Sequence, residues 1–228
     1  MLDKFAPYKG KINSAEAALG MRHAASNGAR LLEDAQSLFA AGRFPSATAL
    51  AILAIEEFGK IGQIRSIFIA DNAAALKSSW RAFRSHTAKN VLWTASNMDW
   101  SRSEFLGNVF ALSSPASAHP ALGDLIKQLS FYVDLLANGQ WSVPAEVIDA
   151  AMAERFIASA QYLQRVSSPE CEEELDIFAD VVKRYVEHTL ESAEAMQADY
   201  YQRLQEAGLR PPGHNPWIGL ITRRANEP

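Results

Sequence analysis

The chain has 228 residues, of which 48% are hydrophobic and 21% are charged, and its formal net charge is −4. This length and composition allow one globular domain or two small ones with a sizeable core, and the nearly balanced charge neither favours nor excludes a polyanionic partner. The single cysteine, Cys171, excludes an internal disulfide and a cysteine-rich zinc site. It fits a reducing compartment, so we expect a cytoplasmic protein.

The start of the chain, MLDKFAPYKGK, lacks the apolar segment of a signal peptide, so we expect no secretion. The longest apolar run, residues 49–55, is far shorter than the roughly 20 residues needed to span a bilayer. We therefore expect no membrane partner.

The N-terminal half of the chain predicts three helices. Asn13 and Glu16 have the spacing of a capping box and open a long first helix. Pro45 suits the first turn of a second helix, which we expect over residues 45–70. Apolar residues cover most of the circumference of this second helix, which is typical of a central core helix. A third helix carries residues 76–93.

The C-terminal half begins with a weakly patterned stretch, residues 97–120, which predicts a loop excursion. A fourth helix is expected over residues 121–136, and two amphipathic helices are expected over residues 144–166 and 169–207. Residues 208–228 form a tail rich in proline and glycine. No segment alternates polar and apolar residues in the way that predicts a strand.

Short connections between long helices with apolar stripes predict an all-α fold, an antiparallel helical bundle. We expect a single helical domain over residues 1–207, followed by the tail. Charge is unevenly distributed, because residues 56–93 contain six basic and three acidic side chains. Such a local excess of positive charge favours a ligand that carries phosphate.

The stretch SATALAILAIEEFGK, residues 46–60, places two adjacent carboxylates in the central helix. Buried carboxylates need partners, so Glu56 and Glu57 are expected to lie in a narrow polar seam. Glu56 and Lys60 are four residues apart and lie on one helix face. The seam is therefore either a functional site or a structural salt bridge between Glu56 and Lys60 beside a solvated Glu57.

Three segments resemble one family. LAILAIEEFGK contains an EExGK motif, RAFRSHTAKN contains His86 and Lys89, and FYVDLLANGQWSVP follows them in the chain. In this order they resemble the AbiV-type abortive-infection proteins, an all-helical branch of the HEPN superfamily. The resemblance implies a HEPN-like core with additional C-terminal helices, and a role in defence against phage.

His86 and Lys89 are three residues apart, so on a helix both can serve one site. An imidazole can take or give a proton near neutral pH, and an ammonium beside it can stabilise negative charge on a phosphodiester. The alternative is an ordinary packed or surface histidine, which is common on helices.

HEPN ribonucleases cut RNA without a metal through an Arg-x4-6-His motif, commonly with composite sites at a dimer interface. Arg81 and His86 fit that spacing, and the resemblance therefore implies RNA as partner, a homodimer, and no metal or cofactor. Five residues along a straight helix are about 140° apart, so these two side chains share a site only if the helix bends or starts late there, or a second subunit contributes. Arg84 is a further cation near Arg81, and its alternative role is that of a solvated surface residue.

Tyr132 and Asp134 belong to the third motif, and an aspartate in the middle of a helix is expected to need a partner, either Lys127 or a cation of the central seam. The candidate site residues fall into two groups. The catalytic candidates are His86, Lys89, Glu57 and Arg81, and the substrate-binding candidates are Lys60, Glu56, Arg84, Tyr132 and Asp134.

The resemblance implies a phage-defence protein that cleaves RNA, or binds RNA and inhibits translation. The alternative is a non-catalytic helical module that binds a protein partner, either a phage-encoded activator or the translation machinery. A third hypothesis is a sensor of small nucleotides, which a ligand would stabilise against heat. The sequence has no di-iron, P-loop, hydrolase-elbow or zinc-protease motif.

Overall fold

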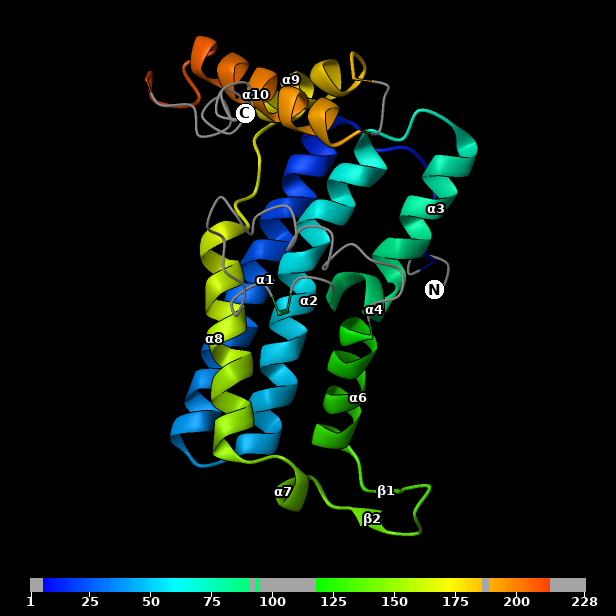
Figure 1. The fold of residues 1–228 in the computed structure, drawn as a ribbon, viewed down its shortest axis with the longest axis vertical. Helices are drawn as coiled ribbons and strands as arrows, with labels where there is room; N and C mark the ends of the chain where they lie inside the picture. The colour runs from blue at the N-terminus through cyan, green and yellow to red at the C-terminus, as the bar shows by residue number, and fades with distance from the viewer. Residues whose placement is uncertain (1–5, 91–92, 95–117, 186–188, 214–228) are drawn as a thin grey trace, which may run out of the picture. The chain divides into compact units, whose positions relative to one another are not determined.

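A computed structural model describes residues 6–90, 93–94, 118–185 and 189–213. Over these residues the protein is almost entirely helical, which confirms the all-α prediction (Figure 1). The elements are α1 (Ser14–Ala40), α2 (Phe44–Phe68), α3 (Ala73–Arg84), α4 (His86–Lys89), α6 (His119–Phe131), β1 (Asp134–Leu135), β2 (Trp141–Ser142), α7 (Pro144–Val147), α8 (Ala150–Val166), α9 (Glu172–Val182) and α10 (Leu190–Glu206).

The described chain divides into two compact units, whereas the sequence predicts one helical domain over residues 1–207. The first unit comprises residues 1–12 and 19–169, and the second comprises residues 13–18 and 170–228. The division follows the end of α8, where Ser167, Ser168 and Pro169 interrupt the helical pattern. The expected loop excursion over residues 97–120, apart from residues 118–120, and most of the expected C-terminal tail lie outside the described residues.

In the first unit, α2 is the central helix. It contacts α3, α4, α6, α7 and α8, and Figure 1 shows α8 and α6 on opposite sides of it. Buried residues occur on all faces of α2, among them Ile52, Ile55 and Phe58. As the sequence predicts, Pro45 lies in the first turn of α2. Proline is tolerated there because amide hydrogens in the first turn have no partner within the helix. The core of this unit therefore surrounds the helix that carries Glu56.

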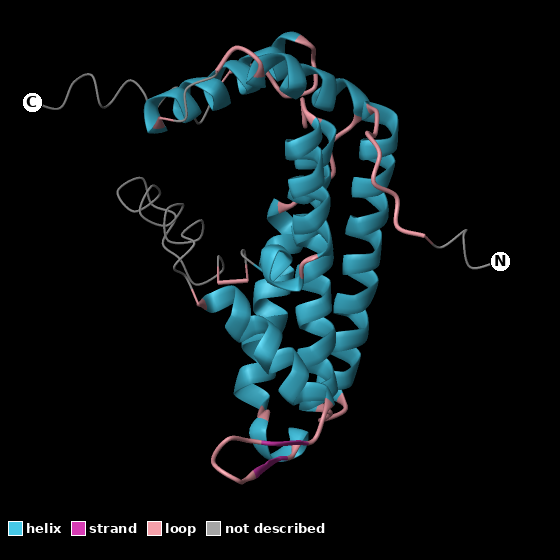
Figure 2. Ribbon diagram, turned by 90° about the vertical axis from the view of Figure 1, so that its right-hand side faces the viewer, coloured by secondary structure: helices cyan, strands magenta, loops and turns pink. Residues whose placement is uncertain are grey.

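The turn between α1 and α2 makes these two long helices antiparallel (Figure 2). Gly42 adopts φ +71°, a left-handed conformation that glycine tolerates, and its amide hydrogen-bonds to the Phe39 carbonyl at 2.9 Å. The capping box at the start of α1 is confirmed. The Glu16 amide donates to Asn13 Oδ1 at 2.8 Å, and the Asn13 amide donates to Glu16 Oε2 at 2.9 Å.

The predicted third helix is wrong in its length. Ser85 interrupts it with ψ 127°, so α3 ends at Arg84 and the separate short helix α4 begins at His86. The Ser85 hydroxyl accepts a hydrogen bond from the Ala88 amide at 3.3 Å and so caps α4. Trp93 follows α4, stacks on Phe156 of α8 with 5.0 Å between ring centroids, and holds this part of the chain against the bundle.

The predicted fourth helix also ends earlier than expected. α6 stops at Phe131, and the chain turns through Asn138 and Gly139 into a hairpin of β1 and β2, with Leu135 opposite Trp141. Gly139 has φ +78°, a left-handed conformation that glycine tolerates, and its amide donates to the Leu136 oxygen at 2.8 Å and closes the turn. Asp134 is therefore on a strand, and the prediction that it lies within a helix is wrong.

The second unit contains α9, α10 and the first turn of α1. Arg203 Nη1 on α10 lies 2.6 Å from Asp180 Oδ2 on α9. The rings of Phe178 and Tyr200 meet edge to face, with 5.2 Å between their centroids. Cys171 caps α9 through its sulfur. Within the described part of the chain, no helix combines the length and apolarity that crossing a membrane requires.

Candidate functional site

Glu56 is the centre of the most concentrated polar contacts in the first unit. Its side chain is only 4% exposed, yet its two oxygens meet three basic side chains from α4 and α6. Lys127 Nζ lies 2.6 Å from Oε1, His86 Nδ1 lies 2.7 Å from Oε2, and Lys89 Nζ lies 3.6 Å from Oε2. With Asp124, which pairs with Lys127 at 2.8 Å, these residues form what we call the Glu56 cluster.

Gly59 explains how α4 comes so close to α2. A Cβ atom at this position would lie 2.3 Å from the backbone oxygen of Lys89, a distance that no side chain can occupy. One turn further along α2, Gln63 Nε2 approaches the Ala88 oxygen at 3.5 Å. The glycine of the EExGK motif is therefore a packing requirement, because it lets α4 place His86 and Lys89 beside Glu56.

His86 is the solvent-facing member of the cluster, with its side chain 58% exposed. In the neutral tautomer that makes this hydrogen bond, Nδ1 carries the hydrogen and donates it to Glu56 Oε2. Nε2 is then the ring nitrogen available to a ligand arriving from solvent. The buried carboxylate thus orients an exposed imidazole, an arrangement suited to proton transfer.

The pKa values of the two lysines in the cluster are shifted in opposite directions. Burial, and less strongly the positive charge of Lys60, lower the pKa of Lys89, and together they outweigh the raising effect of Glu56 and Glu57. Burial also acts to lower the pKa of Lys127, but its contacts with Asp124 and Glu56 outweigh that effect, so the pKa of Lys127 is raised. Lys127 therefore holds its proton firmly, whereas Lys89 releases its proton more readily.

Glu56, His86 and Asp124 could also offer ligands to a metal ion, since one atom of each lies within 4.8 Å of the others. However, the Lys127 ammonium already lies between the carboxylates, 2.6 Å from Glu56 Oε1 and 2.8 Å from Asp124 Oδ1. A divalent cation at this position would have to displace that internal positive charge.

Of the two alternatives for the seam, the salt bridge between Glu56 and Lys60 is wrong. Lys60 pairs instead with Glu57, with 2.5 Å between Lys60 Nζ and Glu57 Oε1. Adjacent residues of a helix point about 100° apart, so Glu57 faces a different direction from Glu56. The side chain of Lys60 is 23% exposed, and its Nζ lies 5.8 Å from the centre of the Phe83 ring. Solvent thus reaches Lys60, while the side chain of Lys89 is only 8% exposed.

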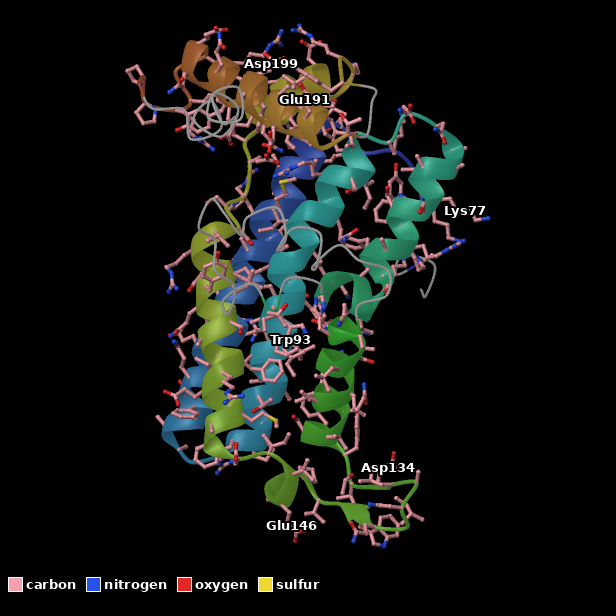
Figure 3. All side chains as sticks on the ribbon, in the orientation of Figure 1. Lys77, Trp93, Asp134, Glu146, Glu191 and Asp199 are labelled. Atoms are coloured by element: carbon pink, nitrogen blue, oxygen red, sulfur yellow. The ribbon has the colours of Figure 1, made fainter. Side chains whose placement is uncertain are left out.

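The other predicted site residues lie elsewhere in the first unit. Arg81 and Arg84 line a separate groove along α3 together with Lys77, which is labelled in Figure 3. Tyr132 and Asp134 lie at the hairpin, beyond the end of α6, and Figure 3 shows Asp134 there. Asp134 Oδ1 accepts a hydrogen bond from the Leu135 amide at 2.8 Å. The expected pairing of Asp134 with Lys127 is wrong, because Lys127 binds Glu56 and Asp124.

Asp124 and Lys127 were not predicted as members of this site. The signal that could have revealed Lys127 is its position on α6, where it lies on the buried face with Gly123, Ile126 and Ser130. A lysine on the core-facing stripe of an amphipathic helix requires an internal partner. Its spacing of three residues from Asp124 then makes a shared pair with that carboxylate possible.

Comparison with known families identifies the chain. The sequence model of AbiV, a HEPN family, matches residues 16–165, about two thirds of the chain. The chain belongs to the AbiV family. The match includes the Glu56 cluster, the residues of α3 that line the separate groove, and the hairpin. It ends before α9. Membership of AbiV supports a role in abortive infection, that is, in defence against phage. No curated protein and no solved structure matched the chain.

Proposed function

We propose that this AbiV protein is a metal-independent endoribonuclease that acts in abortive infection, with His86 as its general acid–base. The observation that carries the proposal is the contact of 2.7 Å between His86 Nδ1 and the buried Glu56 Oε2, which leaves the other ring nitrogen toward solvent. A buried carboxylate that orients an imidazole and leaves its second nitrogen open to solvent gives an acid–base catalyst the fixed orientation that it needs.

RNA carries its own nucleophile, the 2′-hydroxyl. In the proposed reaction His86 Nε2 accepts the 2′-hydroxyl proton while the 2′-oxygen attacks the adjacent phosphorus. The bond from phosphorus to the 5′-oxygen breaks, and that oxygen leaves with a proton from water. The resulting hydroxide takes the proton that His86 holds, which returns the imidazole to its neutral form. Lys60, which solvent reaches, stabilises the charge on the phosphate oxygens, and the buried Lys89, 3.6 Å from Glu56 Oε2, adds positive charge to the site. The products are a 2′,3′-cyclic phosphate and a 5′-hydroxyl.

The test is cleavage of a mixed-sequence RNA at fixed salt by the purified chain, alone and with lysate from phage-infected cells to supply an activator. The His86→Ala variant is expected to lose at least about 100-fold in rate, since general acid–base catalysis contributes that much or more. The matched control is His23→Ala, because His23 is an exposed histidine on α1. The wild type should leave 2′,3′-cyclic phosphate ends and should not cut the 2′-deoxy substrate.

Chelation gives a second readout of the same reaction. Because the Lys127 ammonium lies between Glu56 and Asp124, activity is expected to continue in excess EDTA. Equal rates for wild type and His86→Ala, or no cleavage by the folded wild type with and without lysate, would remove the enzymatic proposal.

A second candidate function is a non-catalytic module that binds a protein partner. The observation that favours it is a set of exposed apolar side chains on α6 and the hairpin, which we call the hairpin patch. Its members are Leu122, Leu125, Phe131, Tyr132, Val133, Leu135, Leu136 and Trp141, each between 39% and 66% exposed. Large exposed apolar surfaces commonly mark protein interfaces. The partner would be a second copy of the chain, a phage-encoded activator or the translation machinery.

A further inference from the structure

A groove of about 680 Å³ lies along α3, apart from the Glu56 cluster. Its lining residues are Lys9, Ala73, Leu76, Lys77, Trp80, Arg81, Arg84 and Ser85. Trp80 Nε1 donates to the Gly10 oxygen at 3.0 Å, and Arg84 donates to the Tyr8 oxygen, so the segment before α1 is fastened along this helix. The volume is within the range of about 300–1,000 Å³ that is usual for small-molecule sites.

All the charged side chains that line this groove are positive. Four of its lining side chains are cationic and none is acidic. Among the described residues, Lys9, Lys77 and Arg81 form no ion pair, and Arg84 bonds to a backbone carbonyl, which leaves its charge unneutralised. Like charges held together raise the local potential, and an anion with several charges would relieve their mutual repulsion. Arginine and lysine are also the side chains that recognise phosphate.

The groove also has a flat apolar part. The Trp80 ring is fixed by its bond to Gly10 and by edge-to-face contacts with Tyr8 at 6.0 Å and Phe83 at 5.5 Å. The Arg84 guanidinium lies 4.9 Å from the centre of that ring. Leu76 adds aliphatic surface beside it. Aromatic and guanidinium planes of this kind are surfaces on which nucleobases stack.

We propose that the α3 groove binds a nucleoside polyphosphate, with its phosphates on Lys9, Lys77 and Arg81 and its base against Trp80 and Leu76. Inorganic polyphosphate would satisfy the cations alone, and an apolar ligand would satisfy the ring alone. A nucleotide satisfies both, and its size suits the groove. This site is separate from the proposed nuclease site, because no residue of the Glu56 cluster lines it.

The test is isothermal titration calorimetry of the full chain at fixed ionic strength. Mg²⁺ is left out so that it does not bind the phosphates of the probes. The probes are each of the four nucleoside triphosphates, a nucleoside, tripolyphosphate and a mixed-sequence RNA 12-mer. At least one nucleoside triphosphate is expected to bind more tightly than both tripolyphosphate and the nucleoside. The Lys77→Ala/Arg81→Ala double variant is expected to weaken that binding at least about tenfold.

The matched control is Arg22→Ala/Arg155→Ala, which removes the same charge from exposed positions on α1 and α8 and should change the affinity by less than about twofold. His86→Ala should bind nucleotide normally, so a failed nuclease proposal leaves this test intact. No binding of any triphosphate, equal binding of tripolyphosphate, an equal loss in both double variants, or binding of the RNA alone would each overturn the nucleotide site.

Discussion

Glu56 determines the electrostatics of its cluster because it is a buried carboxylate with three basic neighbours. The neighbours do not contribute equally. Lys127 is held between two carboxylates and has a raised pKa, whereas burial lowers the pKa of Lys89 despite its contact with Glu56. The ammonium of Lys127 therefore stabilises the fold. The charged form of Lys89 is disfavoured by burial, which is typical of a functional group.

This difference predicts unequal effects of removing the two charges. Lys127→Met leaves Glu56 and Asp124 without their shared cation and is expected to destabilise the first unit by about 3 kcal/mol, as breaking a buried ion pair does. Lys89→Met removes a charge that burial disfavours and should cost less. The measurement is urea unfolding at pH 7. Lys77→Met, at an exposed position of α3, is the control and should change stability by less than about 0.5 kcal/mol.

The contributions of Lys127 and Lys89 to the free energy of unfolding are predicted to change with pH in opposite directions. The pKa of Lys127 is raised on folding, so its stabilisation is complete below the ordinary value of 10.5 and is lost as pH rises through the folded value. The pKa of Lys89 is lowered, so stability from this group increases as pH rises from its folded pKa towards 10.5. Equal stability of Lys127→Met and Lys89→Met at neutral pH would contradict this assignment.

At the scale of elements, the contact between α2 and α4 decides whether the cluster forms. α4 is only one turn long, so its own hydrogen bonds cannot hold it in place. It is seated by the Ser85 cap, by the Gln63 side chain, and by the close approach that Gly59 permits. His86 and Lys89 are consequently positioned by α2.

Two glycines of α2 provide a direct comparison. Gly59→Ala places a methyl group 2.3 Å from the Lys89 oxygen, so it is expected to displace α4, destabilise the protein by about 1–3 kcal/mol and reduce RNA cleavage. At Gly62 an added Cβ meets nothing within 4 Å. Gly62→Ala should therefore stabilise by up to about 1 kcal/mol, because alanine is the better helix former.

The measurements are thermal unfolding and the cleavage rate of each glycine variant. Similar behaviour of Gly59→Ala and Gly62→Ala would mean that the approach of α4 to α2 is not needed. If Gly59→Ala cleaves RNA more slowly but unfolds at the same temperature as the wild type, the displacement of α4 affects the Glu56 cluster and not the stability of the fold.

At the scale of the whole molecule, the match to AbiV extends over residues 16–165 and thus lies almost entirely in the first unit. That unit contains the Glu56 cluster, the α3 groove and the hairpin patch. The second unit has its own contacts between α9 and α10, including the pair of Arg203 and Asp180. We therefore expect the activity of the family to reside in the first unit.

Self-association is predicted to use the hairpin patch. Leu135 and Trp141 face each other across the hairpin and are 54% and 66% exposed. The Leu135→Ser/Trp141→Ser double variant should abolish a concentration-dependent dimer in sedimentation velocity, with little change in unfolding temperature. The control, Leu19→Ser/Val166→Ser, alters two exposed apolar residues elsewhere in the first unit and should leave the dimer intact. A wild type that stays monomeric at every concentration would contradict the prediction that the patch mediates self-association.

The sequence by itself determined the helical class, the central position of α2 and the importance of its carboxylates, because these depend on local periodicity, capping and composition. It also indicated His86 and Lys89 through motif and spacing. The tertiary structure alone decided that Glu56 meets Lys127 and Asp124 from α6, and that Lys60 pairs with Glu57. It likewise showed that Ser85 breaks the helix between Arg81 and His86, and that Asp134 lies on a hairpin beyond α6. Partners from distant segments are chosen by how the helices pack, and that choice leaves no periodic signal in the chain.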